Sequence, residues 1–314
     1  MRLDALLPSQ KIITSVLLSL ILSAAALAGD TNAKSAIPGT INYVEGQVEI
    51  GTETLNSQLV GIAQLQTNQS LTTEDGKAEI LLTPGVFLRV GHDTSVKMIS
   101  PSQTNTDVAL EQGHAIVEVA ERDPRNTIHI TKGRSNTWLS ETGLYDFNLN
   151  QKELRVFEGK AIVGTGEKPI SVKAGHEVSL DSGEQPEVQK FNKRLYEDGD
   201  LYGWSSLRSG YLAEANIDAA GLYAKKGSRS WRAASRDGDW SWDPWFGVFT
   251  FVPSDGISYS TFGWGFYSPG WVVKAPFHIG CYHHQFSTNV QNWGPGSHYV
   301  EGHNYSNGIY NGPG

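Results

Sequence analysis

The sequence predicts a mainly β protein. Antiparallel hairpins form a twisted, irregular solenoid or a sandwich, followed by one amphipathic helix and an aromatic, glycine-rich C-terminal extension. Between residues 37 and 189, apolar and polar side chains alternate in short runs separated by Gly, Pro, Asn and Asp. Such alternation is typical of antiparallel strands with one buried face. Helical spacing appears only after residue 191, and 18 of the 32 aromatic residues fall within 241–314.

Residues 1–28 predict a cleaved signal peptide. Basic residues precede an uncharged, mostly apolar run over 12–28, which closes on Ala26-Leu27-Ala28. A small-x-small triplet after such a run is the pattern that signal peptidase cuts, so we expect the mature chain to begin at Gly29. The alternative is a retained membrane anchor, for which a run of 17 residues is marginal. Cleavage implies a periplasmic or extracellular protein that is not integral to the membrane.

The predicted β domain, 37–189, contains a loose internal repeat in which a glycine precedes a strand of small or β-branched residues. The repeat glycines are Gly46, Gly76, Gly113, Gly159 and, more faintly, Gly175. Glycine accepts positive φ, which suits it to the turn that leads into a strand. The spacings of 30, 37, 46 and 16 residues are unequal, whereas a regular solenoid would keep its period. We therefore expect irregular hairpins, with chance similarity of the glycine positions as the alternative.

An amphipathic helix is predicted within 191–226. Apolar side chains recur there at helical spacing, as at Leu201, Trp204, Leu207 and Leu212. Asp198 or Asp200 is the expected N-terminal cap, and Gly221 the expected end. The polar face is not basic, so we expect the helix to pack on the β domain rather than lie on a membrane surface.

The C-terminal part is predicted as an aromatic, glycine-rich extension over 227–285 and a low-complexity, disordered tail over 286–314. Residues 241–314 hold 12 of the 34 glycines but only four charged side chains.

Four tryptophans of this extension are candidate binding residues: Trp242, Trp245, Trp264 and Trp271. A tryptophan ring packs well on the apolar face of a sugar ring. Aromatic, glycine-rich sequence also builds irregular cores, because each ring buries a large apolar area. The sequence leaves both uses open.

Composition and motifs predict a binding protein rather than an enzyme. The net charge of −8 argues against nucleic-acid binding. Nucleotide-binding, hydrolase and zinc-protease motifs are missing, so no catalytic residue and no cofactor is expected. Five histidines lie beside the single cysteine, Cys281, in the last 37 residues. Their spacing matches no zinc template, so we expect no metal site, with soft-metal binding as the alternative.

The stretch from Leu71 to Val90 resembles the core of FecR domains. A Gly-x-Ala strand start at Gly76-Lys77-Ala78 is followed by a Pro-Gly turn at 84–85 and by a strand ending in Leu88-Arg89. The resemblance covers roughly residues 40–165, about two fifths of the chain. The segments 201–209 and 242–247 are similar to the C-terminal extension of exported FecR-domain proteins that lack the cytoplasmic sigma-regulator region.

The resemblance implies a periplasmic β module that receives a signal, because FecR is similar to a transmembrane sigma regulator with such a domain. Only about ten residues precede the apolar segment here, so we do not expect direct sigma-factor regulation. The expected function is a non-catalytic, extracytoplasmic binding or signal-sensing module whose partner is an unknown envelope protein or glycan. The alternative is a structural or surface-matrix protein that self-associates or adheres through its glycine-aromatic tail.

Overall fold

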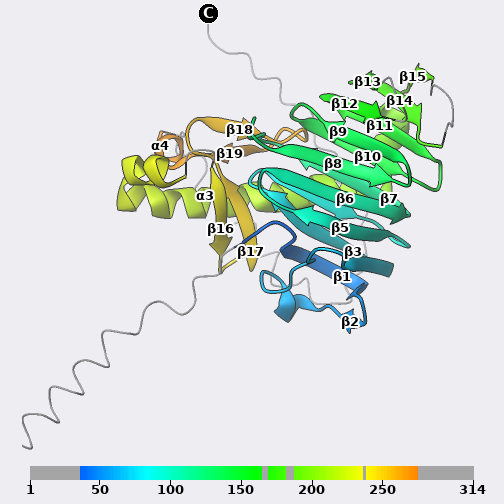
Figure 1. Cartoon of the computed structure of the whole chain (residues 1–314). Coiled ribbons are helices and arrows are strands. Elements are labelled where there is room, and N and C mark those ends of the chain that lie inside the picture. The colour runs from blue at the N-terminus through cyan, green and yellow to red at the C-terminus, as the bar shows by residue number, and fades with distance from the viewer. Residues whose placement is uncertain (1–35, 165–168, 182–186, 236–237, 275–314) are drawn as a thin grey trace, which may run out of the picture. The chain divides into compact units, whose positions relative to one another are not determined.

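A computed structural model describes residues 36–164, 169–181, 187–235 and 238–274. The fold is mainly β with one long helix, as predicted (Figure 1). The described residues up to Val273 belong to one compact unit. The predicted signal peptide, the predicted tail and Cys281 with its neighbouring histidines lie outside the described residues, and the predicted domain boundaries stay predictions.

The strands are β1 (Ile41–Ile50), β2 (Glu53–Thr54), β3 (Ser70–Thr83), β4 (Val86–Val90), β5 (Ser95–Pro101), β6 (Asn105–Gln112), β7 (His114–Val119), β8 (Thr127–Lys132), β9 (Ser135–Leu139), β10 (Gly143–Asn148), β11 (Glu153–Glu158), β12 (Lys160–Gly164), β13 (Ile170–Lys173), β14 (His176–Ser179), β15 (Val188–Lys190), β16 (Asp239–Asp243), β17 (Val248–Val252), β18 (Ile257–Tyr259) and β19 (Gly265–Tyr267). The helices are η2 (Ser57–Leu59), α2 (Arg194–Glu197), α3 (Asp200–Ala234) and α4 (Pro269–Val272).

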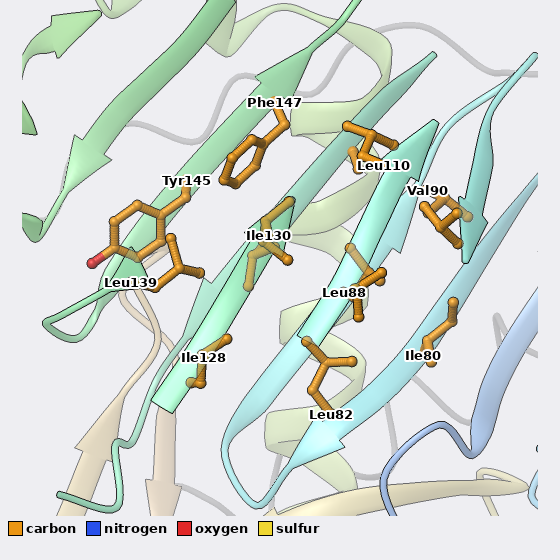
Figure 2. Packing of buried hydrophobic residues seen from close by; sticks show 14 of the residues in the cluster. Ile80, Leu82, Leu88, Val90, Leu110, Ile128, Ile130, Leu139, Tyr145 and Phe147 are labelled. Carbon is orange, nitrogen blue, oxygen red and sulfur yellow. The ribbon is translucent and has the colours of Figure 1, made fainter. Parts of the chain in front are cut away.

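The first fifteen strands form one sheet that folds over a single apolar core. Long β3 pairs with β4 through residues 78–83 and with β5 through residues 70–72, so it joins two layers. The first layer contains β4, β7, β10, β11, β14 and β15, and the second contains β5, β6, β8, β9, β12 and β13. Figure 2 shows side chains of both layers, such as Leu88 and Ile130, in the core between them. Strand pairing is antiparallel except between β6 and β8, which the chain reaches only after crossing to β7.

The repeat glycines have two different structural roles. Gly46 and Gly76 face each other inside the paired strands β1 and β3. Gly113 and Gly159 instead lie where the chain crosses from one layer to the other, between β6 and β7 and between β11 and β12. At Gly113, φ is +88° and an added Cβ would lie 2.3 Å from Oγ1 of Thr94, in the neighbouring crossing. Glycine therefore allows successive crossings to stack closely.

Helix α3 is longer than predicted. It continues through Gly221, and its regular geometry breaks only at Gly227 (φ 110°, ψ 105°). The N-cap residue is Gly199 rather than an aspartate, and Asp200 instead pairs with Lys77. In Figure 1 the helix runs behind the strands. No described helix combines the length and apolar character that a membrane crossing requires.

Helix α3 and the extension cover the outer face of the first layer. Leu201 packs there with Ile116, Leu144 and Phe157. A further apolar cluster joins the sheet, α3 and the two C-terminal hairpins: Leu81, Phe87, Leu212, Phe249, Phe251 and Phe266 are among its members. Part of the aromatic extension therefore belongs to the folded core.

Side-chain amides tie the extension to the rest of the protein. Asn42 of β1 accepts from the amide nitrogen of Phe249 at 2.7 Å and donates to its carbonyl oxygen at 2.9 Å. Asn216 of α3 bonds in the same two-way manner to the backbone of Tyr267 and also donates to Phe251 O at 2.8 Å. These amides satisfy backbone groups that a neighbouring strand would otherwise bond.

We predict that Gly113→Ala destabilises the protein more than Gly133→Ala, a matched control with φ +56° and open space around its Cβ. Left-handed geometry alone costs about 1 kcal/mol for alanine. The close approach to Thr94 should add about 1–3 kcal/mol in the Gly113 variant. Urea unfolding measures both values, and equal losses would contradict the stacked-crossing explanation.

Candidate functional site

Four strands of the first layer (β4, β7, β10 and β11) and β3 each carry a buried charged residue between apolar neighbours on the outer face. These residues are Glu79, Arg89, Glu118, Asp146 and Arg155, and each is at most 4% exposed. Their neighbours in each strand point into the core between the layers, so the charged side chains point toward α3 and α2. A buried charge is costly unless it is paired and hydrogen-bonded.

Strand register places four of these charges in one row across the sheet, whereas Glu118 lies in a neighbouring row, opposite Phe87 and Leu144. Glu79 pairs with Arg89, and Asp146 pairs with Arg155. Ile116 lies between Arg89 and Asp146 in the same row. Arg155 is in turn opposite Glu177 of β14. Cross-strand neighbours thus carry opposite charges on both sides of a central isoleucine, an arrangement that stabilises strand pairs.

The Arg89 cluster, formed by Glu79, Arg89, Glu118, Arg208 and Ser209, joins this row to α3. Arg89 donates through Nε to Glu79 at 2.8 Å and through Nη1 to Glu118 at 2.6 Å. From α3, Arg208 Nη2 donates to Glu79 Oε1 at 2.9 Å, and Ser209 Oγ donates to Glu118 Oε2 at 2.5 Å. Two arginines and two glutamates make the cluster neutral.

The same cluster reaches β1 and the extension. Asn42 Nδ2 donates to Glu79 Oε1 at 2.9 Å, and Asn42 is also the residue that bonds to Phe249 of β17. The guanidinium of Arg208 lies 4.1 Å from the ring centre of Tyr43, a favourable cation–π distance. The Glu79 carboxylate therefore contacts groups from β1, β4 and α3 at once.

Electrostatics keep Glu79 ionised despite its burial. Loss of solvent alone would raise the pKa of this carboxyl. The charges and hydrogen bonds of Arg208 and Arg89 outweigh that effect and lower the pKa from its ordinary value of 4.5 to about 2. Burial likewise opposes the charge of Arg89, but Glu118 and Glu79 raise its pKa overall.

A second group, the Arg155 cluster, attaches α2 to the sheet. Arg155 Nε donates to Glu177 at 3.1 Å, and Nη1 lies 3.5 Å from Asp146. Asp146 also contacts His114 Nε2 at 2.5 Å. The ring of Tyr196 in α2 lies 3.9 Å from the guanidinium of Arg155. Burial would lower the pKa of Arg155, but Asp146, followed by Tyr196 and two glutamates, raises it.

Lys77 of β3 provides a third attachment, at the start of α3. Its ammonium lies 3.0 Å from Asp200 and 3.5 Å from Glu45. It also lies 6.0 Å from the ring centre of Trp204 in the next turn of the helix. Both the start of α3 and the segment around Arg208 are therefore held by charged groups of β3.

These contacts suit mechanical coupling between the sheet and α3. The charged groups are directed at one another rather than into an open cavity. Within the part of the chain that the structure describes, no group of three His, Cys, Asp or Glu residues is placed to hold a metal ion.

The four predicted tryptophans lie on different elements. Trp242 in β16 is half-buried and packs on Phe249. Trp245, in the turn after β16, is 73% exposed. Trp264 precedes β19 close to Gly210 of α3, and Trp271 belongs to α4; they are 45% and 43% exposed. Sugar stacking by these residues stays a prediction.

Sequence reasoning missed the charge row. The resemblance segment contains Glu79 and Arg89, but its alternating pattern predicts only a pair of strands. The available signal was one charge inside each apolar run, as in Ala-Glu-Ile-Leu and Phe-Leu-Arg-Val. Pairing of these charges depends on strand order, which the sequence does not display.

We predict that Glu79 contributes to acid sensitivity. Its folded-state pKa is depressed, so its stabilisation is present above pH 4.5 and is lost as the pH falls toward 2. The unfolding free energy of the wild type should therefore fall more steeply between pH 6 and pH 3 than that of Glu79→Gln. Urea titrations at each pH measure both slopes. The control is Glu141→Gln, at an exposed ion pair with Lys160, which should keep the wild-type slope. If Glu79→Gln also kept the wild-type slope, Glu79 would not be a source of the acid sensitivity.

Comparison with known proteins gives one family match. The model of the family described as FecR protein matches residues 68–162. No curated protein matches the chain.

Two solved structures, each described as a putative anti-sigma factor from Parabacteroides distasonis, are partly similar to this chain. The first has 13% identity and a TM-score of 0.35, and the match covers 41% of this chain and 64% of that one. The second has 12% identity and a TM-score of 0.34, with 44% and 63% coverage. The matches thus span less than two thirds of either structure.

Proposed function

Because residues 68–162 form a FecR domain, we propose that the protein is a signal-sensing regulatory module that acts by binding. The observation that carries the proposal is the Arg89 cluster. Its sheet residues, Glu79, Arg89 and Glu118, lie inside the matched segment, and its other residues, Arg208 and Ser209, lie on α3. A ligand that shifts the FecR strands would also shift the groups that hold the helix.

The proposed signal path leads from the FecR domain through α3 to the extension. A buried ion network has few alternative geometries, because a charge that loses its partner becomes strongly destabilising. Small displacements of β3 or β7 would therefore move α3 as a body rather than be absorbed locally. Asn216 of α3, which bonds to β17 and β19, would extend that movement to the hairpins.

We further propose that the protein acts outside the cytoplasm, with an envelope protein or glycan as its partner. The support is the sequence of residues 1–28. Expression of the whole chain with a C-terminal tag tests this: the protein should appear in the extracytoplasmic fraction with Gly29 as its first residue, read by mass spectrometry. Recovery from the cytoplasm with an intact N-terminus would contradict it.

The sensing proposal is tested by crosslinking in the envelope followed by hydrogen exchange. A partner captured by the full chain should, when purified and added back, change amide exchange in residues 200–216 as well as at its binding face. Arg208→Met should still bind the partner but transmit a smaller change to α3. A partner that leaves α3 exchange unaltered, or the failure of any envelope component to crosslink, would contradict the proposal.

Self-association through the tail is the competing function, and size-exclusion chromatography separates it. Because residues 239–267 pack into the fold, the shortened chain for this comparison should end at Val273. The sensing proposal expects the full and the shortened chain to have the same oligomeric state. Assembly that disappears on removal of residues 274–314 would favour the matrix function.

A further inference from the structure

The outer face of the second layer carries a groove that neither α3 nor the described part of the extension lines. Its volume is about 630 Å³, and its lining includes Lys97, Ile99, Asp107, Ala109, Glu111 and Thr131. Small-molecule sites typically measure about 300–1,000 Å³. We propose that this groove binds an uncharged oligosaccharide. The proposal deepens the sensing function by naming a ligand class, but it rests on the groove alone.

Strand register places the polar side chains of the groove on one surface. Lys97, Ala109 and Thr131 lie in a row across β5, β6 and β8. Asp107 starts the next row, which continues through His129 to Trp138 of β9. The residues on either side of these positions point into the core, so both rows face outward.

Both carboxylates in the groove already bind hydroxyl groups. Thr131 Oγ1 donates to Asp107 Oδ1 at 3.1 Å, and Ser95 Oγ donates to Glu111 Oε2 at 2.9 Å. Each carboxylate has a second oxygen that can accept a further hydroxyl. Lys97 is half-buried and forms no ion pair with any residue that the structure describes, so its ammonium is available as a donor. Sugar hydroxyls both donate and accept, and this set of groups satisfies both needs.

Charge and apolar surface favour a neutral sugar chain. Lys132 is already paired with Asp181, so the remaining charged lining residues are Lys97, Asp107 and Glu111. Because these carry both signs, the groove complements neither a polyanion nor a polycation. Ile99, which is 38% exposed, and Ala109 offer apolar contact for the C–H face of a sugar ring. Half-buried Trp138 extends this surface, with the Arg122 guanidinium 6.0 Å from its ring centre.

The test is ligand-observed saturation-transfer NMR and calorimetry on the mature full-length protein. The probes are maltohexaose and the hexamer of β-1,4-linked N-acetylglucosamine, and the peptide Lys-Gly-Gly-Glu tests the zwitterionic alternative. We expect at least one hexasaccharide to bind. Asp107→Ala and Lys97→Ala should each weaken that binding about tenfold, as expected when a hydrogen bond to a charged group is lost.

Two controls make the result decisive. Lys173→Ala, on an exposed position of β13 outside the groove, should bind as the wild type does. Thermal unfolding should show that all three variants are folded. Three results would overturn the proposal: neither sugar binds, the Asp107 and Lys97 variants bind the sugar as tightly as the wild type, or only the peptide binds. Because the assay needs no partner and no movement of α3, its failure is distinguishable from failure of the sensing function.

Discussion

The carboxylate of Glu79 is the constraint on which the rest of the structure depends. It is fully buried and has an arginine from β4 on one oxygen and an arginine from α3, together with Asn42, on the other. A lone carboxylate could not remain charged there. Strands β1 and β4 and helix α3 must therefore all be in place before Glu79 is satisfied, and Asn42 extends the link to β17. One residue thus connects assembly of the sheet to docking of the helix.

This dependence explains why the extension is not an appendage. Asn42 contacts Glu79 and Phe249 together, and the phenylalanines of the hairpins pack on Phe87 beside the ion network. The apolar cluster excludes water from the charges, and the charges fix the position of the helix on which the hairpins pack. On the opposite layer, the groove is lined by residues of β5, β6, β8 and the turn after β8, and no α3 residue is among them.

Strand alternation predicted the class of fold because burial on one face imposes a period of two. The turn role predicted for the repeat glycines holds at Gly113 and Gly159 but not at Gly46 and Gly76, which lie inside β1 and β3. Their use at layer crossings depends on which strands become neighbours. The predicted end of the helix at Gly221 was wrong, because packing of α3 on the hairpins overrides the weak helix preference of glycine. The charge row and the groove were missed for one reason: Glu79, Arg89 and Asp107 acquire their partners through strand pairing across the chain, which a local pattern does not contain.

The most direct test of this account is a double-mutant cycle between Glu79 and Arg208, measured by urea unfolding of the wild type, Glu79→Gln, Arg208→Met and the double variant. If the buried pair holds α3 on the sheet, the losses of unfolding free energy in the two single variants will add up to about 2 kcal/mol more than the loss in the double variant. A difference of this size is within the range found for residues in one network. Additive losses, agreeing within about 0.5 kcal/mol, would show that the two residues act independently and would contradict the central role given to Glu79.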